Sequence, residues 1–125
     1  MVFSKTLLKV SDNSGVKYAK CLKVLQTKSA SGKLNYGSVG DIILVSSRVC
    51  SSTKTIKKGD VFKAVIVRSK RTVKRDVGLL FFKENAVVLL NKKMLPEGTR
   101  VFGPISLEVR RRNFSKISAL ATLVI

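Results

Sequence analysis

Apolar residues recur along the chain in short segments separated by turn-forming residues such as Asp12-Asn13-Ser14-Gly15. Several segments have the length and the β-branched composition of strands. These predicted strands are Thr6–Val10, Val16–Thr27, Val39–Val45, Val61–Val67 and Ala86–Leu90. Short strands at roughly even spacing predict a mainly β protein, a small β-barrel with a helical tail.

The segment that begins at Val61 changes character along its length. Between Val61 and Val67 both faces of an extended chain are mostly apolar, which is typical of a strand buried between layers. The following residues are densely cationic: Arg68, Lys70, Arg71, Lys74 and Arg75. We predict a strand that leaves the core and continues as a charged arm. A solvated edge strand, whose charges prevent aggregation, is the alternative.

The charged arm is followed by signs of a hairpin. Asp76-Val77-Gly78 is a turn sequence, and Leu79–Phe82 is apolar enough to return as a second leg. The basic arm is therefore predicted to be one leg of a ribbon that projects from the barrel.

The remaining segments are less regular. Ser46–Thr55 is polar and is predicted to be a connection or an edge. Arg100–Phe102 is a short extended piece that Gly103-Pro104 is expected to stop. From Ile105 onward the apolar period changes to that of short helical turns.

The net charge of the chain limits the kinds of molecule that we expect it to bind. The chain has 125 residues, a formal net charge of +18 and a hydrophobic fraction of 45%, which together indicate one folded, strongly basic domain. Self-repulsion of this size favours a polyanionic partner, and nucleic acid ranks first. An anionic membrane surface ranks second, because the sequence has no basic amphipathic helix of useful length and no apolar run long enough to span a bilayer.

The residues needed for common catalytic sites are missing. The chain has no histidine, which excludes a Ser-His-Asp triad and His-based metal motifs. Most carboxylates lie at turns, and Glu108 is expected to pair with the adjacent arginines 110–112. Cys21 and Cys50 are distant from each other, and Cys21 is expected to be a buried thiol. We predict no enzyme, no metal and no cofactor, although a carboxylate pair assembled by folding stays open.

Lysine and arginine side chains neutralise phosphates, which supplies affinity and position more than base specificity. The candidate contacts are Lys17, Lys20, Lys23, Lys57, Lys58, Arg68, Lys70, Arg71, Lys74, Arg75, Arg110, Arg111 and Arg112. Phe81 and Phe82 are adjacent and point opposite ways on a strand, which makes a poor stacking platform. Structured RNA that is recognised by shape fits this composition better than unstructured single strands.

A series of motifs spans nearly the whole chain. They are Asp12-Asn13-Ser14-Gly15, Cys21-Leu22-Lys23-Val24-Leu25, Val39-Gly40-Asp41-Ile42-Ile43, Lys57-Lys58-Gly59-Asp60-Val61, Lys63-Ala64-Val65-Ile66-Val67-Arg68, Asn85-Ala86-Val87-Val88-Leu89-Leu90-Asn91 and Gly98-Thr99-Arg100-Val101-Phe102-Gly103-Pro104. In this order and spacing they make the chain resemble the universal large-subunit ribosomal protein fourteen, in its bacterial and organellar form.

The resemblance implies a fold and a function. The expected fold is a single ribosomal-protein domain over residues 1–125. It contains a five-stranded β-barrel (about 1–103), a projecting β-ribbon (about 68–80) and a C-terminal region with two short helices (about 104–125). The expected function is that of a structural constituent of the large ribosomal subunit. The candidate cations would then bind large-subunit rRNA near the subunit interface, with contacts to small-subunit rRNA.

Protein partners are implied as well. Ribosomal proteins three and nineteen are the expected neighbours on the large subunit. A ribosome-silencing factor that blocks subunit joining would contact the positions of Thr99, Arg100 and Lys116.

Some segments depart from the family pattern. Asp76-Val77-Gly78 stands where the family usually has Asp-Gly, which affects the shape of the ribbon tip. The loops Thr27–Tyr36 and Ser46–Thr55 differ from bacterial ones, which favours the mitochondrial matrix over a bacterial cytoplasm or a plastid. Met1 stands at the usual family start, which then favours a gene inside the organelle.

Two other functions are the alternatives. One is a free-standing RNA chaperone or single-strand nucleic-acid-binding barrel protein. The other is a cationic regulator that docks on an acidic protein or a membrane.

Overall fold

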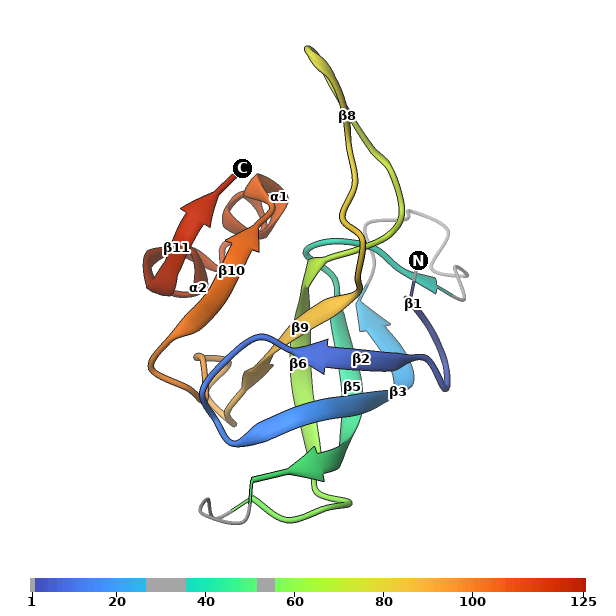
Figure 1. The fold of residues 1–125 in the computed structure, drawn as a ribbon, viewed down its shortest axis with the longest axis vertical. Coiled ribbons are helices and arrows are strands. Elements are labelled where there is room, and N and C mark those ends of the chain that lie inside the picture. The colour runs from blue at the N-terminus through green and yellow to red at the C-terminus, as the bar shows by residue number, and fades with distance from the viewer. Residues whose placement is uncertain (1, 27–35, 52–55) are drawn as a thin grey trace.

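The computed structural model describes residues 2–26, 36–51 and 56–125, which form mainly β-strands with two short helices near the C-terminus (Figure 1). Residues 27–35, which make up nearly all of one divergent loop, lie outside the described residues. Residues 52–55 of the other divergent loop lie outside them too.

Five strands close into a barrel: β2 (Leu7–Val10), β3 (Val16–Gln26), β5 (Ile42–Cys50), β6 (Val61–Arg68) and β9 (Ala86–Leu90). Neighbouring strands pair antiparallel except at the closure, where β2 and β9 run parallel. Closure leaves none of these five strands with an open edge in the sheet. The predicted five-stranded β-barrel is confirmed.

Strand β6 has apolar cores on both of its faces. Ala64 and Ile66 point into the barrel interior, whereas Val65 and Val67 belong to a second cluster outside it. All four side chains are completely buried. The prediction of a strand buried on both faces is therefore confirmed for this part of β6.

The second apolar cluster joins the barrel to the C-terminal region. That region consists of β10 (Val101–Ile105), α1 (Leu107–Arg111), α2 (Ser115–Leu120) and β11 (Ala121–Val124). Val109 and Ile117 are the buried residues of the two helices, and they pack with Val65 and Val67 of β6. The two predicted short helices are confirmed.

Gly103-Pro104 does not end the extended piece before it, so that prediction was wrong. β10 continues to Ile105 and pairs in parallel with β11, a strand that the sequence pattern did not indicate. A register shift between Val101 and Pro104 accommodates the proline. The boundary between the barrel and the C-terminal region, which was placed near residue 103, stays a prediction. Strand β10 begins before this boundary and ends after it.

The predicted ribbon is a hairpin of β7 (Val73–Arg75) and β8 (Gly78–Leu80), with Arg75 paired to Gly78 across the turn. It projects away from the barrel beside the C-terminal region (Figure 1). A further small sheet joins β1 (Val2–Phe3) to β4 (Tyr36–Gly37).

The expected connection or edge at Ser46–Thr55 was wrong for its first half, because β5 continues to Cys50. Ser46 pairs with β3 on one side and with β6 on the other. The Ser47 hydroxyl is buried and donates to the carbonyl of Lys57 at 2.6 Å. A polar side chain is accommodated inside this strand because its hydroxyl group has a hydrogen-bond acceptor there.

Candidate nucleic-acid interface

Arg68 is the last residue of β6, and its side chain turns inward. The guanidinium donates to the carbonyl oxygens of Phe102 (2.9 Å) and Pro104 (3.0 Å), and to the Ser11 hydroxyl (2.6 Å). It also pairs with Glu84 at 3.1 Å. Burial lowers the pKa of Arg68, an effect that Glu84 partly offsets. Arg68 therefore ties the barrel to β10, although in the sequence it is indistinguishable from the other cations of the arm.

Arg75 ties the ribbon to the first helix. Its Nε and Nη2 atoms donate to the two carboxylate oxygens of Glu108 at 3.0 and 2.7 Å, and Nη2 also donates to the Ser106 hydroxyl at 3.0 Å. Such a two-pronged contact fixes orientation as well as distance. Glu108 forms its ion pair with Arg75 rather than with the expected arginines 110–112, because α1 turns this carboxylate toward β7. Of those three arginines, Arg111 contributes a nearby positive charge.

The surroundings of Glu108 favour its ionised form. Burial opposes ionisation, but the hydrogen bond from Arg75 and the nearby charges of Arg75 and Arg111 outweigh it. The pKa of Glu108 is therefore held below its ordinary value. Glu108 is ionised at neutral pH and available to hold the ribbon.

Arg112 is also engaged by the protein. Its Nη2 lies 3.2 Å from Oδ1 of the buried Asp41. The other carboxylate oxygen of Asp41 accepts from the backbone N–H of Ser38 at 2.8 Å. A Cβ atom at Gly40 would lie only 2.9 Å from Cγ of Arg112, and Gly40 also has a φ of +89°. Glycine is therefore required for this close approach.

Four predicted contacts remain exposed on the ribbon and on α1: Lys70 at the ribbon base, Lys74 on β7, and Arg110 and Arg111 on α1. We call these four residues the ribbon–helix surface. The Arg75–Glu108 pair holds β7 beside α1, so cations that are far apart in the sequence belong to neighbouring segments. Arg71, at the base of the ribbon, instead lies over the Tyr36 ring, 4.6 Å from its centroid.

The other predicted cations lie elsewhere on the barrel. Lys57 and Lys58 precede β6, whereas the ribbon follows it, so the length of the strand separates them by roughly 23 Å. On β3, Lys17 and Lys23 are exposed and Lys20 is half-buried. The structure therefore does not gather all the predicted cations into one patch.

Sequence reasoning missed three cations that lie beside predicted ones. Arg48 lines a hollow together with Lys57 and Lys58. Lys9 and Lys83 line another hollow together with Lys70. Each of the three is a single charge within an apolar or mixed segment, a pattern too common on exposed strand faces to indicate a site.

A comparison with known families gives a match over the full length of the chain. The family model described as ribosomal protein L14p/L23e matches residues 1–125, the whole chain. The chain belongs to this family.

Membership of the L14p/L23e family makes the chain a structural ribosomal protein of the large subunit, located in the ribosome. The family implies ribosomal RNA and ribosomal proteins as partners, and it is not known as a family of enzymes.

Thr99 and Arg100, two residues of the predicted partner surface in this L14p/L23e chain, are held by a single asparagine. The Asn13 side-chain oxygen accepts from the backbone N–H groups of Thr99 (2.7 Å) and Arg100 (3.0 Å). The Asn13 amide also donates to the Thr99 hydroxyl at 2.8 Å. Thr99 and Lys116 line one hollow of about 420 Å³. The motif around Asn13 thus positions two of the three predicted residues.

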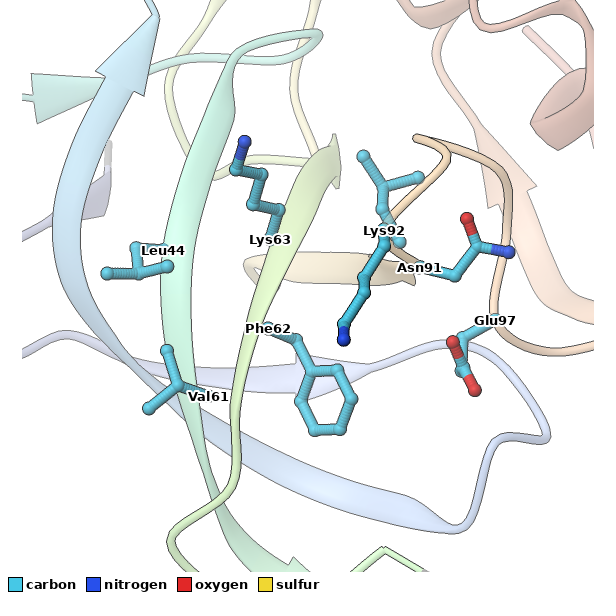
Figure 2. Close-up of a pocket in the computed structure, with 8 residues that line it drawn as sticks. Leu44, Val61, Phe62, Lys63, Asn91, Lys92 and Glu97 are labelled. Atoms are coloured by element: carbon cyan, nitrogen blue, oxygen red, sulfur yellow. The ribbon is translucent and has the colours of Figure 1, made fainter.

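A hollow of about 510 Å³ lies on the barrel wall (Figure 2). It is lined by Leu44, Val61, Phe62, Lys63, Leu90, Asn91, Lys92 and Glu97. Figure 2 shows Phe62 and Lys92 pointing into the same space. Glu97 supplies the single carboxylate of this lining, so the hollow assembles no carboxylate pair.

Two further observations concern only the described part of the chain. No cluster of three or more histidine, cysteine or carboxylate side chains suited to a metal ion is found there. Nor is any helix in those ranges long and apolar enough to cross a membrane.

Proposed function

We propose that this chain binds large-subunit rRNA near the subunit interface and helps to form contacts with small-subunit rRNA. The observation that carries the proposal is the Arg75–Glu108 pair, which holds β7 against α1. The exposed cations Lys74 and Arg110 therefore lie on neighbouring segments. Cations on a rigid scaffold contact phosphates without first losing conformational freedom.

The predicted arginines divide into two roles in this proposal. The ribbon–helix surface contacts phosphates directly. Arg68, Arg75 and Arg112 position the ribbon and the C-terminal region, because their guanidinium groups are engaged by protein acceptors. Lys17, Lys20, Lys23, Lys57 and Lys58 supply further phosphate contacts on other sides of the barrel.

The proposal extends to particular partners and to a compartment. Ribosomal proteins three and nineteen are the proposed neighbours. The hollow at Thr99 and Lys116, with exposed Arg100 beside it, is the proposed surface for a ribosome-silencing factor. The divergent loops support a mitochondrial ribosome.

The test replaces Lys70, Lys74, Arg110 and Arg111 with glutamine and measures affinity for large-subunit rRNA over a range of salt concentrations. We expect weaker binding and a salt slope that falls by about one for each lost phosphate contact. The matched control replaces four exposed lysines elsewhere, namely Lys5, Lys63, Lys92 and Lys93. An equal effect of the control set would contradict a localised surface.

Sedimentation distinguishes the proposal from a free-standing RNA chaperone or single-strand binder. The full chain is expected to co-sediment with large subunits and to bind short unstructured oligonucleotides only weakly. A protein that instead ran free of subunits and bound such oligonucleotides tightly would overturn the proposal.

A further inference from the structure

Two adjoining hollows open between the barrel and the base of the ribbon. The first has a volume of about 240 Å³ and is lined by Leu7, Lys9, Tyr18, Lys70, Lys83, Glu84 and Asn85. The second has a volume of about 420 Å³, and its lining includes Phe82 and Phe102. Lys9, Lys83 and Glu84 line both hollows and form the boundary between them.

Tyr18 presents an aromatic ring in the first hollow. It lies on β3 directly across from Lys9 of β2, and 43% of its surface is exposed. Leu7, which is 61% exposed, adds an apolar surface. A solvent-accessible ring beside lysine amines is the arrangement with which proteins stack unpaired bases.

The charge around this ring is positive. Lys9, Lys70 and Lys83 contribute three cations against the carboxylate of Glu84. Arg68 lies 3.1 Å and Lys9 3.6 Å from that carboxylate, so it is already paired within the protein. Lys70 and Lys83, both exposed, are the cations best placed to receive phosphates.

The base of the ribbon is fixed at this hollow. The backbone N–H of Lys70 donates to the side-chain oxygen of Asn85 at 2.9 Å, and the backbone N–H of Lys9 donates to the Asn85 carbonyl at 3.2 Å. The site is therefore formed before any ligand arrives, from β2, β3 and the ribbon base together.

We propose that the first hollow holds the base of an unpaired rRNA nucleotide, stacked on Tyr18 with its neighbouring phosphates at Lys70 and Lys83. The inference rests on the proposed function and specifies the kind of rRNA element that is bound. Folded RNA presents such bases in bulges and loops, where they are free to stack on aromatic side chains.

Fluorescence of Tyr18 tests stacking directly, because the chain has two tyrosines and no tryptophan. In a Tyr36→Phe variant, Tyr18 is the remaining fluorophore. A five-nucleotide oligouridylate at low salt is expected to bind weakly and to quench this fluorescence in a saturable manner. An abasic oligomer with the same phosphates is expected to leave it nearly unchanged. Equal quenching by the two probes, or none by either, would overturn the proposal.

Substitutions separate the roles of ring and charge. Tyr18→Leu should weaken binding of the oligouridylate about 5- to 100-fold, whereas Tyr18→Phe should retain it. Lys70→Gln and Lys83→Gln should each weaken both probes, and Lys93→Gln serves as the exposed control. Retained affinity in Tyr18→Leu, with its fold verified by circular dichroism, would also overturn the proposal.

The inference and the proposed function fail in different ways. If Tyr18 is not quenched but the chain co-sediments with large subunits, only the stacking site is wrong. If Tyr18 is quenched but the chain does not co-sediment, the rRNA function is wrong and the single-strand alternative gains support.

Discussion

The barrel and the ribbon of this L14p/L23e-family protein are held in place by different forces. The barrel encloses fully buried apolar side chains, among them Ile43, Ile66 and Leu89. The ribbon has two strands of three residues each and no core of its own, and such a hairpin is marginal in isolation. Its position depends on directed contacts, chiefly the pairing of Arg75 with Glu108.

This difference explains how one chain combines a stable fold with a basic surface of fixed orientation. Apolar burial is non-directional and supplies most of the folding free energy. Charged hydrogen bonds contribute less to stability but define orientation. Changes in the two regions should therefore have separable effects on stability and on rRNA binding.

The largest loss of stability is expected in the barrel. Ile66→Ala removes a fully buried side chain from the interior cluster and should lower the free energy of unfolding by about 2–5 kcal/mol. Urea denaturation measures this change. For the molecules that remain folded, the salt slope of rRNA binding should be unchanged, and an altered slope would argue against separate roles.

An intermediate loss of stability is expected at Arg68, where the barrel is tied to β10. Arg68→Met leaves the partly buried carbonyls of Phe102 and Pro104 without this donor and should cost about 1–3 kcal/mol in urea denaturation. Lys70→Met, on the exposed side of the same run, is the control and should change stability little. Equal effects of the two substitutions would contradict the structural role of Arg68.

The smallest loss of stability is expected at the contact between the ribbon and α1, and the size of this loss depends on pH. The pKa of Glu108 is depressed in the folded protein, so the stabilisation from its ionised form is present above its ordinary value of 4.5 and is lost as the pH falls through the folded-state pKa. Glu108→Gln should cost about 0.5–1 kcal/mol at pH 7 and less at about pH 3. Urea denaturation at both pH values measures the difference. A loss that did not shrink in acid would exclude the ion pair as its cause.

Sequence patterns predicted a small β-barrel with a helical tail because local periodicity reflects burial, whereas the five strands and the two helices were implied by the family resemblance. The apolar residues of Ala86–Leu90 and both faces of β6 are examples. The extension of β5 through Ser46 and Ser47 was missed because these residues are polar, and the acceptor of the buried Ser47 hydroxyl, the carbonyl of Lys57, lies ten residues away in the chain.

The candidate site could be predicted only in part. Arg68, Lys70 and Arg75 look alike in the sequence, but Phe102 and Glu108, the partners that separate their roles, lie more than thirty residues away. The sequence did not indicate a role for Tyr18 either. A single aromatic residue on a strand indicates a base-stacking site only once its spatial neighbours are known.

Exchanging Arg75 and Glu108 is the most direct test of the claim that their ion pair fixes the orientation of the ribbon relative to α1. Arg75→Glu and Glu108→Arg alter net charge in opposite directions, whereas the double exchange leaves it unchanged. We predict that each single variant lowers affinity for large-subunit rRNA and that the double variant recovers most of it. If instead affinity followed net charge alone, falling in Arg75→Glu and rising in Glu108→Arg, the account would be contradicted.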